Sequence, residues 1–387
     1  RRVRARPRQR RREGRRRGCR AAARQSTEVR ARVADRLDEP DRQQADDEHR
    51  DRQPQGTLHA GGRRIGGHAA QAIRAGAPPG GGYIAADLAI ATHPQALVLP
   101  LPGGSPGATV RVWPLRCGEV LMPPRALERP RGPLWQLRGI GLTAPRSRWF
   151  WVPVPVFLVE HPTAGRLLVD TGFHATVRDD PRTSLGRRQA WLLPARLGRE
   201  DSAPARLRAL GVEPADIGLI VMTHLHNDHA SGATQFAHAT FVVDEVEWRA
   251  ASAGGFLQGY RREHYDQPFD WRTIDYAGPA AHAHGAFQRT VDLFGDGSVR
   301  LLSTPGHTLG HQSLLLALDG RELLLTADAA YTRRTIDEDL VPIFFEDERL
   351  YLRSLAQLRE HVRANPRAPV ICGHDAQRWP RLDPIYA

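Results

Sequence analysis

The chain has 387 residues, enough for one large domain with an extension or for two domains. Residues 1–100 hold 22 Arg against 11 Asp and Glu, whereas residues 101–387 hold 33 against 32, so the second part is nearly neutral and gives no electrostatic case for nucleic-acid binding. The three scattered cysteines exclude a disulfide framework and favour a reducing, cytoplasmic location, and no apolar run reaches the ~20 residues of a membrane helix.

Residues 1–107 are predicted to form an Arg-rich, disordered tail, because they contain mainly Arg, Ala, Gly, Gln and Asp and scarcely an aromatic residue. Such a composition cannot bury enough apolar surface to offset the entropy lost on ordering. A basic arm for nucleic acid or acidic surfaces is the functional alternative. The other alternative is upstream sequence translated from a mis-assigned start, since the chain begins with Arg. The folded domain is expected over residues 108–387.

The first predicted strands lie between residues 110 and 169. Alternation over residues 110–115 predicts one strand, and the aromatic and Val-rich run Trp149–Glu160 forms a predicted hairpin with residues 166–169. The hairpin ends in Asp170, which is expected either to orient a histidine by accepting its hydrogen bond or to cap a turn. Residues 176–200 are predicted to form a loop over a site.

A buried strand is predicted over residues 217–222, after a short helix over 203–210. The strand leads into the densest group of metal-ligand side chains in the sequence, which comprises His224, His226, Asp228 and His229. Imidazole and carboxylate ligands suit zinc or a similar divalent ion, and open α/β sheets place their sites at the carboxyl ends of strands. A polar loop with solvated histidines is the alternative.

The middle of the chain gives weaker signals. Residues 240–243 are predicted to form a strand and residues 245–251 a short helix. The span 254–287 is expected to be irregular. Its histidines are interpreted as exposed loop residues, because no strand precedes them: His264, His282 and His284.

The last third of the chain again contains strands that end in Asp or His. Strands are predicted over 299–303, 313–318, 321–326 and 369–372, and an amphipathic helix over 351–362. Pro305-Gly306 breaks the first of these strands so that His307 can turn toward a site. Asp328 and His374 follow two of the others.

Five motifs in this order resemble the metallo-β-lactamase superfamily over residues 108–387. They are Asp-Thr-Gly at 170–172, Thr-His-Leu-His-Asn-Asp-His at 223–229, Thr-Pro-Gly-His-Thr-Leu-Gly-His at 304–311, Asp328, and Gly-His at 373–374. Within the superfamily the chain is similar to the N-acyl-homoserine lactonases. That similarity rests on Pro-Leu-Arg-Cys-Gly at 114–118, on the run 304–314, and on Leu-Thr-Ala-Asp-Ala-Ala-Tyr-Thr at 325–332 with Gly-His-Asp at 373–375.

The resemblance implies an α+β fold, a four-layer αββα sandwich, with two divalent metal ions at one edge of the sheets. Zinc is expected, with iron, manganese or cobalt as alternatives. One ion would be held by His224, His226 and His307, the other by Asp228, His229 and His374, with Asp328 bridging them. Tyr331 would lie beside the substrate carbonyl, with a core or surface tyrosine as the alternative, and His311 would support the fold. The candidate catalytic residues are Asp228, Tyr331 and Asp328.

The chemistry expected of such a centre is hydrolysis of a lactone. A hydroxide shared by two metals would attack the carbonyl of an N-acyl-homoserine lactone, Tyr331 would stabilise the oxyanion, and Asp328 would pass a proton to the leaving alkoxide. The ring-opened product makes this a quorum-quenching activity. Asn227 places a polar residue in the wall of the expected site. The expected partner is therefore a small lactone or acyl ester, with no membrane and no nucleic acid for the catalytic domain.

Other members of the same fold remain alternatives: a thioesterase of glyoxalase type, a β-lactamase-like enzyme or a nuclease. A redox protein with two irons would normally carry a carboxylate where His226 stands. A structural or regulatory metal protein is the non-enzymatic alternative.

Overall fold

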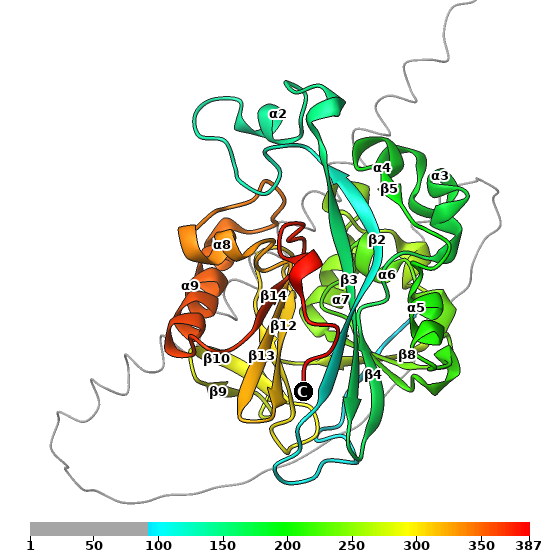
Figure 1. The fold of residues 1–387 in the computed structure, drawn as a ribbon, viewed down its shortest axis with the longest axis vertical. Coiled ribbons are helices and arrows are strands. Elements are labelled where there is room, and N and C mark those ends of the chain that lie inside the picture. Colours follow the sequence, from blue (N-terminus) through cyan, green and yellow to red (C-terminus); the bar gives the residue numbers. More distant parts are fainter. Residues whose placement is uncertain (1–91) are drawn as a thin grey trace, which may run out of the picture. The chain divides into compact units, whose positions relative to one another are not determined.

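The computed structural model describes residues 92–387, which form two β-sheets packed face to face (Figure 1). The first sheet has eight strands in the order β1-β8-β7-β6-β4-β3-β2-β5, and the second has six in the order β14-β13-β12-β11-β10-β9. Strands β4, β6, β7 and β8 run parallel to one another, whereas most neighbours in the second sheet are antiparallel.

Helices lie between many of the strands, whereas β8 to β13 follow one another along the chain without a helix between them. The strands are β1 (Gln95–Ala96), β2 (Arg111–Met122), β3 (Phe150–His161), β4 (Gly165–Val169), β5 (Ala195–Arg196), β6 (Leu219–Val221), β7 (Thr240–Asp244), β8 (Asp270–Ile274), β9 (His282–His284), β10 (Phe287–Asp292), β11 (Val299–Ser303), β12 (Gln312–Leu318), β13 (Arg321–Ala327) and β14 (Val370–Cys372). The α-helices are α2 (Trp135–Gly139), α3 (Pro181–Leu185), α4 (Arg187–Leu192), α5 (Ala203–Ala209), α6 (Asn227–Ala230), α7 (Glu245–Ala253), α8 (Arg333–Glu338) and α9 (Glu348–Ala364). The 3-10 helices are η1 (Arg146–Arg148), η2 (Ala175–Arg178), η3 (Pro214–Asp216), η4 (Ala233–Phe236), η5 (Phe256–Gln258), η6 (Arg262–His264) and η7 (Trp379–Arg381).

Buried apolar clusters between the sheets and on their outer faces hold the sheets and helices together. Between the sheets, side chains such as Phe157 and Leu314 form one buried cluster. Helices α5 and α7 pack on the outer face of the first sheet through Leu207 and Trp248, and α9 covers the second sheet through Leu355. Each fully buried side chain of this size stabilises the fold by about 1.5–3 kcal/mol. The predicted four-layer αββα sandwich is therefore confirmed.

The sequence patterns did not predict the strands that lie between residues 254 and 292. Strand β8 pairs in parallel with β7 and buries Trp271, although the short run Asp-Trp-Arg-Thr-Ile lacks the apolar density that identifies a central strand. The interpretation of the three histidines as exposed loop residues is corrected in part, since His282 is exposed but lies in a strand. His264 is buried and its Nε2 lies 2.9 Å from the Ser184 carbonyl oxygen, whereas His282 and His284 lie in the edge strand β9.

The predicted tail extended too far toward the folded domain. Within residues 92–107, β1 pairs with β8, the Leu101 N–H donates to the Leu293 carbonyl, and the Ser105 N–H donates to Asp296. Alternating leucines over residues 97–101 pack against the core between the sheets, and this apolar contact explains why the segment is ordered. The remaining part of the predicted tail, residues 1–91, lies outside the described residues.

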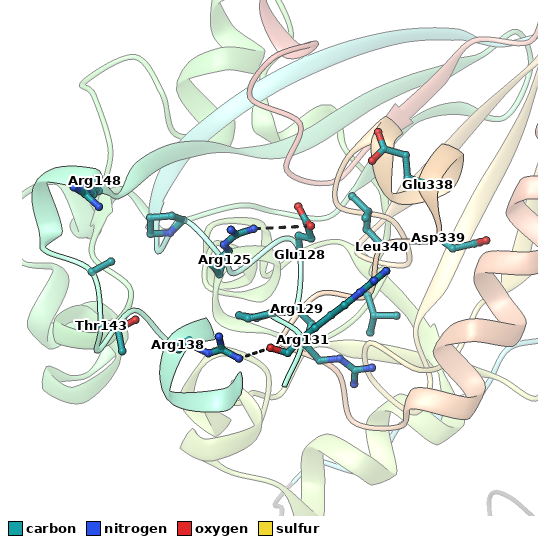
Figure 2. Close-up of a pocket in the computed structure, with 14 residues that line it drawn as sticks. Arg125, Glu128, Arg129, Arg131, Arg138, Thr143, Arg148, Glu338, Asp339 and Leu340 are labelled. Carbon is teal, nitrogen blue, oxygen red and sulfur yellow. Dashed lines mark hydrogen bonds and ion pairs between the residues drawn. The ribbon is translucent and has the colours of Figure 1, made fainter. Parts of the chain in front are cut away.

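Residues 123–148 form an excursion between β2 and β3 that contains α2 and η1. They line a cavity of about 720 Å³ that has five arginines and no histidine in its wall (Figure 2). Arg129 pairs with both carboxylate oxygens of Glu348, and Arg138 donates to backbone carbonyls, so these guanidinium groups hold the excursion in place.

In the part of the chain that the structure describes, no helix has the length and apolarity to cross a membrane. Cys117 and Cys372 are buried free thiols. Burial raises the pKa of the Cys372 thiol to about 12, so it stays protonated at neutral pH.

Candidate metal centre and active site

The strand order brings the predicted site residues to one edge of the two sheets. In the first sheet, Val169 of β4 is level with Val221 of β6, so Asp170 and the 223–229 segment leave the sheet side by side. In the second sheet, Ala327 of β13 is level with Cys372 of β14, which places Asp328 and His374 together. Residues 304–311 connect β11 to β12 at the same edge.

Two of these strand ends have an unusual backbone. Asp170 has φ 62° and Ala327, next to Asp328, has φ 43°, a region that residues with a β-carbon rarely adopt. Strain of this kind costs of order 1–3 kcal/mol and persists where the surrounding contacts fix it, commonly at functional sites. Both strained residues therefore mark the edge where the histidines gather.

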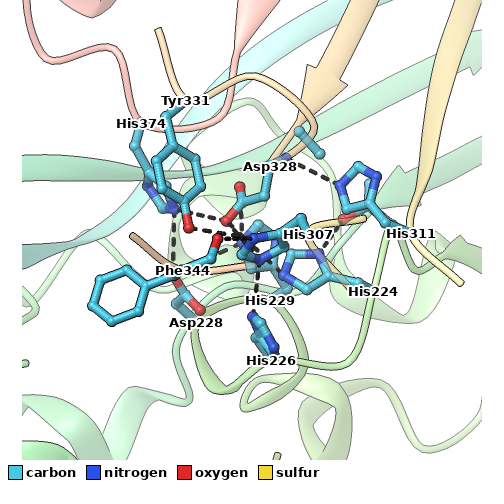
Figure 3. Close-up of polar contacts among 12 residues, drawn as sticks. His224, His226, Asp228, His229, His307, His311, Asp328, Tyr331, Phe344 and His374 are labelled. Carbon is cyan, nitrogen blue, oxygen red and sulfur yellow. Dashed lines mark hydrogen bonds and ion pairs between the residues drawn. The ribbon is translucent and has the colours of Figure 1, made fainter. Parts of the chain in front are cut away.

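All seven predicted metal ligands meet at this edge (Figure 3). Three overlapping groups each have their ligand atoms within 4.8 Å of one another, and they consist of His224, His226 and His307; His224, His229 and Asp328; and Asp228, His229 and His374. The first and third groups share no member, and the second connects them.

Asp328 lies at the centre of this arrangement. Its Oδ2 is 3.2 Å from His374 Nε2 and 3.4 Å from His307 Nε2. Its Oδ1 is 3.5 Å from His229 Nε2. One carboxylate thus faces imidazoles from both of the separate groups, which is the position that a bridging ligand requires.

In three of the histidines, the ring nitrogen that points away from the centre forms a hydrogen bond with an oxygen atom. This hydrogen bond determines which ring nitrogen carries the proton. His229 Nδ1 lies 2.8 Å from Asp170 Oδ2, His374 Nδ1 lies 2.8 Å from the Pro153 carbonyl, and His307 Nδ1 lies 3.1 Å from the Phe344 carbonyl. Since these oxygens accept, each Nδ1 carries a proton, and each Nε2 is the atom that faces the centre and would offer its lone pair to a bound cation. Asp170 therefore orients a histidine, one of the two roles considered for it.

His226 and His307 meet in a different geometry. His226 Nδ1 and His307 Nε2 are 3.0 Å apart, and Nδ1–H of His307 is directed to the Phe344 carbonyl. His226 therefore faces the centre through its Nδ1 atom. Because Nδ1 of His307 carries a proton, its Nε2 accepts a hydrogen bond from Nδ1 of His226, and both nitrogens lie where a cation held by these histidines would bind.

The donor set fits divalent cations. His224 Nε2, His229 Nε2 and Asp328 Oδ1 are buried at the centre and have no hydrogen-bond partner among the described residues. Leaving a buried polar atom unpaired costs about 1–3 kcal/mol. A bound cation would pair with all three of these atoms at once. Three Asp carboxylates surround the histidines, and imidazole with carboxylate is a donor set typical of zinc.

Electrostatics at the centre also favour positive charge. Burial acts to raise the pKa of Asp328, but His374 and His229 hold it well below its usual range. Burial likewise acts to lower the pKa of His229, while Asp228 and Asp170 raise it to about 10. The Asp328 carboxylate thus stays ionised, and in the metal-free chain His229 holds a proton at the position that a cation would occupy.

Tyr331 and His311 lie on either side of this group. Burial and the nearby Asp328 raise the pKa of Tyr331 well above its ordinary value, so its hydroxyl keeps its proton. That hydroxyl lies 3.4 Å from His307 Nδ1, and the ring packs against His374. His311 belongs to none of the three metal-binding groups, and its Nε2 accepts a hydrogen bond from the Asp328 N–H.

A cavity of about 280 Å³ opens onto these residues. Its apolar wall comes from the end of β2, from α4, from η5 and from residues 343–345, and consists of Met122, Leu192, Leu193, Phe256, Leu257, Ile343, Phe344 and Phe345. The predicted loop over the site, residues 176–200, contributes Gln189 and the two leucines, but it contains short helices. Residues 343–345 carried no signal in the sequence. Asn227 is also in the wall, and its buried Oδ1 has no hydrogen-bond partner among the described residues.

Glu247 is a functional candidate that the sequence did not identify. It is fully buried on α7, and its carboxylate accepts hydrogen bonds from the backbone at Leu225 and Gly310. The sequence places Glu247 in the predicted helix 245–251. Only the fold shows that this helix starts beside the two loops that carry candidate metal ligands.

Comparison with known proteins assigns a class to this fold and site. Residues 149–374 match the family model of the metallo-beta-lactamase superfamily. N-acyl homoserine lactonase AttM of Agrobacterium fabrum is 35% identical over 235 residues, which cover 59% of this chain and 84% of that protein. An N-acyl homoserine lactonase of Bacillus cereus is 30% identical over 228 residues, covering 59% and 83%.

The fold comparison agrees. A mutant of Bacillus thuringiensis AiiA, with N-decanoyl-L-homoserine bound at its active site, superposes with a TM-score of 0.59 at 24% identity, covering 72% of this chain and 99% of that one. The fold and the site define a metal-dependent hydrolase, as predicted. The chain belongs to the metallo-β-lactamase superfamily.

Proposed function

We propose that this chain opens the lactone ring of N-acyl homoserine lactones, using two divalent cations, with zinc favoured by the imidazole-rich donor set. The observation that carries the proposal is the convergence of seven ligand side chains in three overlapping groups. The substrate class comes from the curated relatives, which are N-acyl homoserine lactonases at 30–35% identity over more than four-fifths of their length.

The three groups divide naturally between two cations. His224, His226 and His307 would hold one. Asp228, His229 and His374 would hold the other, and Asp328 would touch both because it faces imidazoles of each set. When bound, the pair supplies a nucleophile at neutral pH by lowering the pKa of shared water to about 7, and it polarises the carbonyl.

The chain's own groups would act on the two oxygens of the reacting ester. Tyr331 keeps its proton and lines the cavity, so it can donate a hydrogen bond to the carbonyl oxygen as negative charge develops there. Asp328 is ionised at the centre, so it can accept the proton of the attacking water and deliver it to the ring oxygen. The bond between the carbonyl carbon and the ring oxygen breaks, giving a carboxylate and a hydroxyl.

The cavity suits a substrate with an apolar chain. Its wall contains leucine and phenylalanine side chains from several elements, and the same lining includes histidines and carboxylates of the centre. An acyl chain would lie along the apolar wall while the lactone ring reached the polar end.

The test uses purified chain loaded with zinc, cobalt or manganese and offered homoserine lactones, thioesters and β-lactams. Lactone ring opening is expected, and His226→Ala and Asp328→Ala should each reduce it to the uncatalysed rate, because each removes a ligand from the centre. His282→Ala, on the exposed edge strand β9, is the control and should leave the rate unchanged. Activity that survives both ligand variants contradicts the proposal, and a preference for thioesters or β-lactams would reassign the substrate.

A further inference from the structure

Two loops that carry histidines of the proposed metal centre approach each other above helix α7. The 224–229 segment follows β6 and the 304–311 loop follows β11, so they come from different sheets. At their base they are joined by Gln312, whose N–H donates to the Thr223 carbonyl at 2.9 Å and whose side-chain amide donates to the Met222 carbonyl at 2.8 Å. This joint lies next to the sheets.

Farther from the sheets, the side chain of Glu247 also connects the two loops. Glu247 Oε1 accepts the Leu225 N–H at 2.8 Å, and Leu225 lies between His224 and His226. Glu247 Oε2 accepts the Gly310 N–H at 3.3 Å. Its carboxylate therefore links a backbone group of one loop to a backbone group of the other, and Glu247 is fully buried.

The packing around this link is tight. A β-carbon added to Gly310 would lie 2.0 Å from the Glu247 nitrogen, so the loop backbone rests directly on the first turn of α7. Asp244 caps that turn by accepting the Val246 N–H at 2.7 Å, which fixes where the helix begins. The position of Glu247 is thus set by the helix and not by the loops it holds.

We infer that Glu247 is a positioning residue of the metal centre, which holds the two loops at the spacing where His226 and His307 meet. The inference rests on the proposed metal centre and adds a residue to it. His226 Nδ1 and His307 Nε2 are 3.0 Å apart, and each lies on one of the two linked loops. Without the carboxylate, fewer contacts, among them the Gln312 joint and the contact between His226 and His307, would connect the loops, so part of the cation's binding free energy would go into bringing them to this spacing.

The test compares Glu247→Gln with Asp244→Asn, measuring zinc affinity by competition with a chelator and the visible spectrum of the cobalt-loaded protein. Glutamine keeps the volume and one acceptor but turns an NH₂ group toward one of the two N–H donors. We expect zinc affinity to fall about 10- to 100-fold and the cobalt bands to change, as is typical when a partner of the ligands is removed. Asp244→Asn changes a buried carboxyl at the N-cap of the same helix but keeps a capping side chain, so zinc affinity and cobalt spectrum should match those of the unaltered protein.

Hydrogen exchange in the metal-free proteins gives a second readout. Amides in residues 224–229 and 304–311 should exchange faster in Glu247→Gln than in Asp244→Asn, because only the former breaks the link. If Glu247→Gln does not fold, Glu247→Asp takes its place, since the shorter side chain cannot reach both donors. Unchanged zinc affinity, cobalt spectrum and exchange in the Glu247 variant would overturn the inference.

The outcomes separate this inference from the proposed function. If the unaltered chain binds metal but does not open lactones, the substrate proposal fails, and an effect of Glu247→Gln on metal affinity still supports the positioning role. If the unaltered chain binds no metal, the proposed centre fails and the inference fails with it.

Discussion

Asp328 is the residue on which the site depends most, because its carboxylate lies within 4.0 Å of imidazole nitrogens from four histidines. Its N–H is held by His311, whose own ring is fixed by Thr304, and the preceding Ala327 has a strained backbone. The backbone at Asp328 is therefore fixed both by the hydrogen bond from its N–H to His311 and by the conformation of the preceding residue. Replacing this aspartate would leave several buried nitrogens facing one another without the negative charge at their centre.

Tyr331 gives a prediction that separates catalysis from metal binding. Tyr331→Phe should lower kcat on the order of 100-fold, because it removes one donor to the developing oxyanion, while KM and metal content change little. Steady-state kinetics with metal analysis check this. The control is Tyr351→Phe, which also removes a buried hydroxyl, but one that lies outside the cavity wall. An equal loss of kcat in both variants would contradict a catalytic role for Tyr331.

Single residues differ in how far the sequence reveals them. His224, His226, Asp228 and His229 could be proposed from spacing alone, since they fall within six positions after an apolar run. Glu247 could not, because it lies in an ordinary helix and its role depends on two backbone N–H groups brought together by the fold. A carboxylate that binds backbone groups leaves no motif.

At the scale of elements, most strands and helices follow from local pattern. Strand β3 and helix α9 were predicted because a long apolar run and a helical repeat are strong signals. Strand β8 was missed because it has only five residues, two of them charged, although it lies inside the sheet next to the edge strand β1. Its burial comes from neighbours on both sides, which a local pattern does not contain.

His264 connects η6 to α3, and its buried imidazole leads to a prediction about how stability depends on pH. Burial lowers the pKa of His264 from 6.5 to about 4, and its Nε2 pairs with the Ser184 carbonyl at the end of α3 while its Nδ1 has no hydrogen-bond partner among the described residues. The unfolded chain binds a proton near pH 6.5, whereas the folded chain does so only near pH 4. The stability that depends on neutral His264 is therefore complete above pH 6.5 and is lost as the pH falls toward 4.

The measurement is urea unfolding of the unaltered protein and of His264→Gln at pH 7 and pH 5, both without metal. Glutamine keeps a donor for Ser184 but does not titrate. Between the two pH values, the unaltered protein should lose about 2 kcal/mol more of its free energy of unfolding than the variant. Equal pH dependence in the two proteins would show that His264 does not titrate as proposed.

At the scale of the whole molecule, the net positive charge and the site residues lie in different parts of the sequence. The excess of arginine lies in residues 1–100, whereas residues 101–387, which hold every site residue, are nearly neutral. The site is instead charged locally, with carboxylates enclosed by two sheets and their loops. The order of motifs was enough to predict this architecture and its superfamily, but the apolar wall of the cavity came only from the fold, since its residues lie on four separate segments.

Metal binding should stabilise the folded chain, because the ligands converge only after both sheets have formed. A ligand that binds only the folded state, at a free concentration 100 to 1,000 times its dissociation constant, adds about 3–4 kcal/mol to the free energy of unfolding. Chelation should therefore lower the melting temperature, and zinc should restore it.

The most direct test of the central claim is the number of zinc ions bound per chain, determined by elemental analysis as metal-free protein is titrated and assayed for lactone ring opening. The account predicts saturation at two ions, with activity returning as they bind. Saturation at one ion, or ring opening that persists in the metal-free protein, would contradict it.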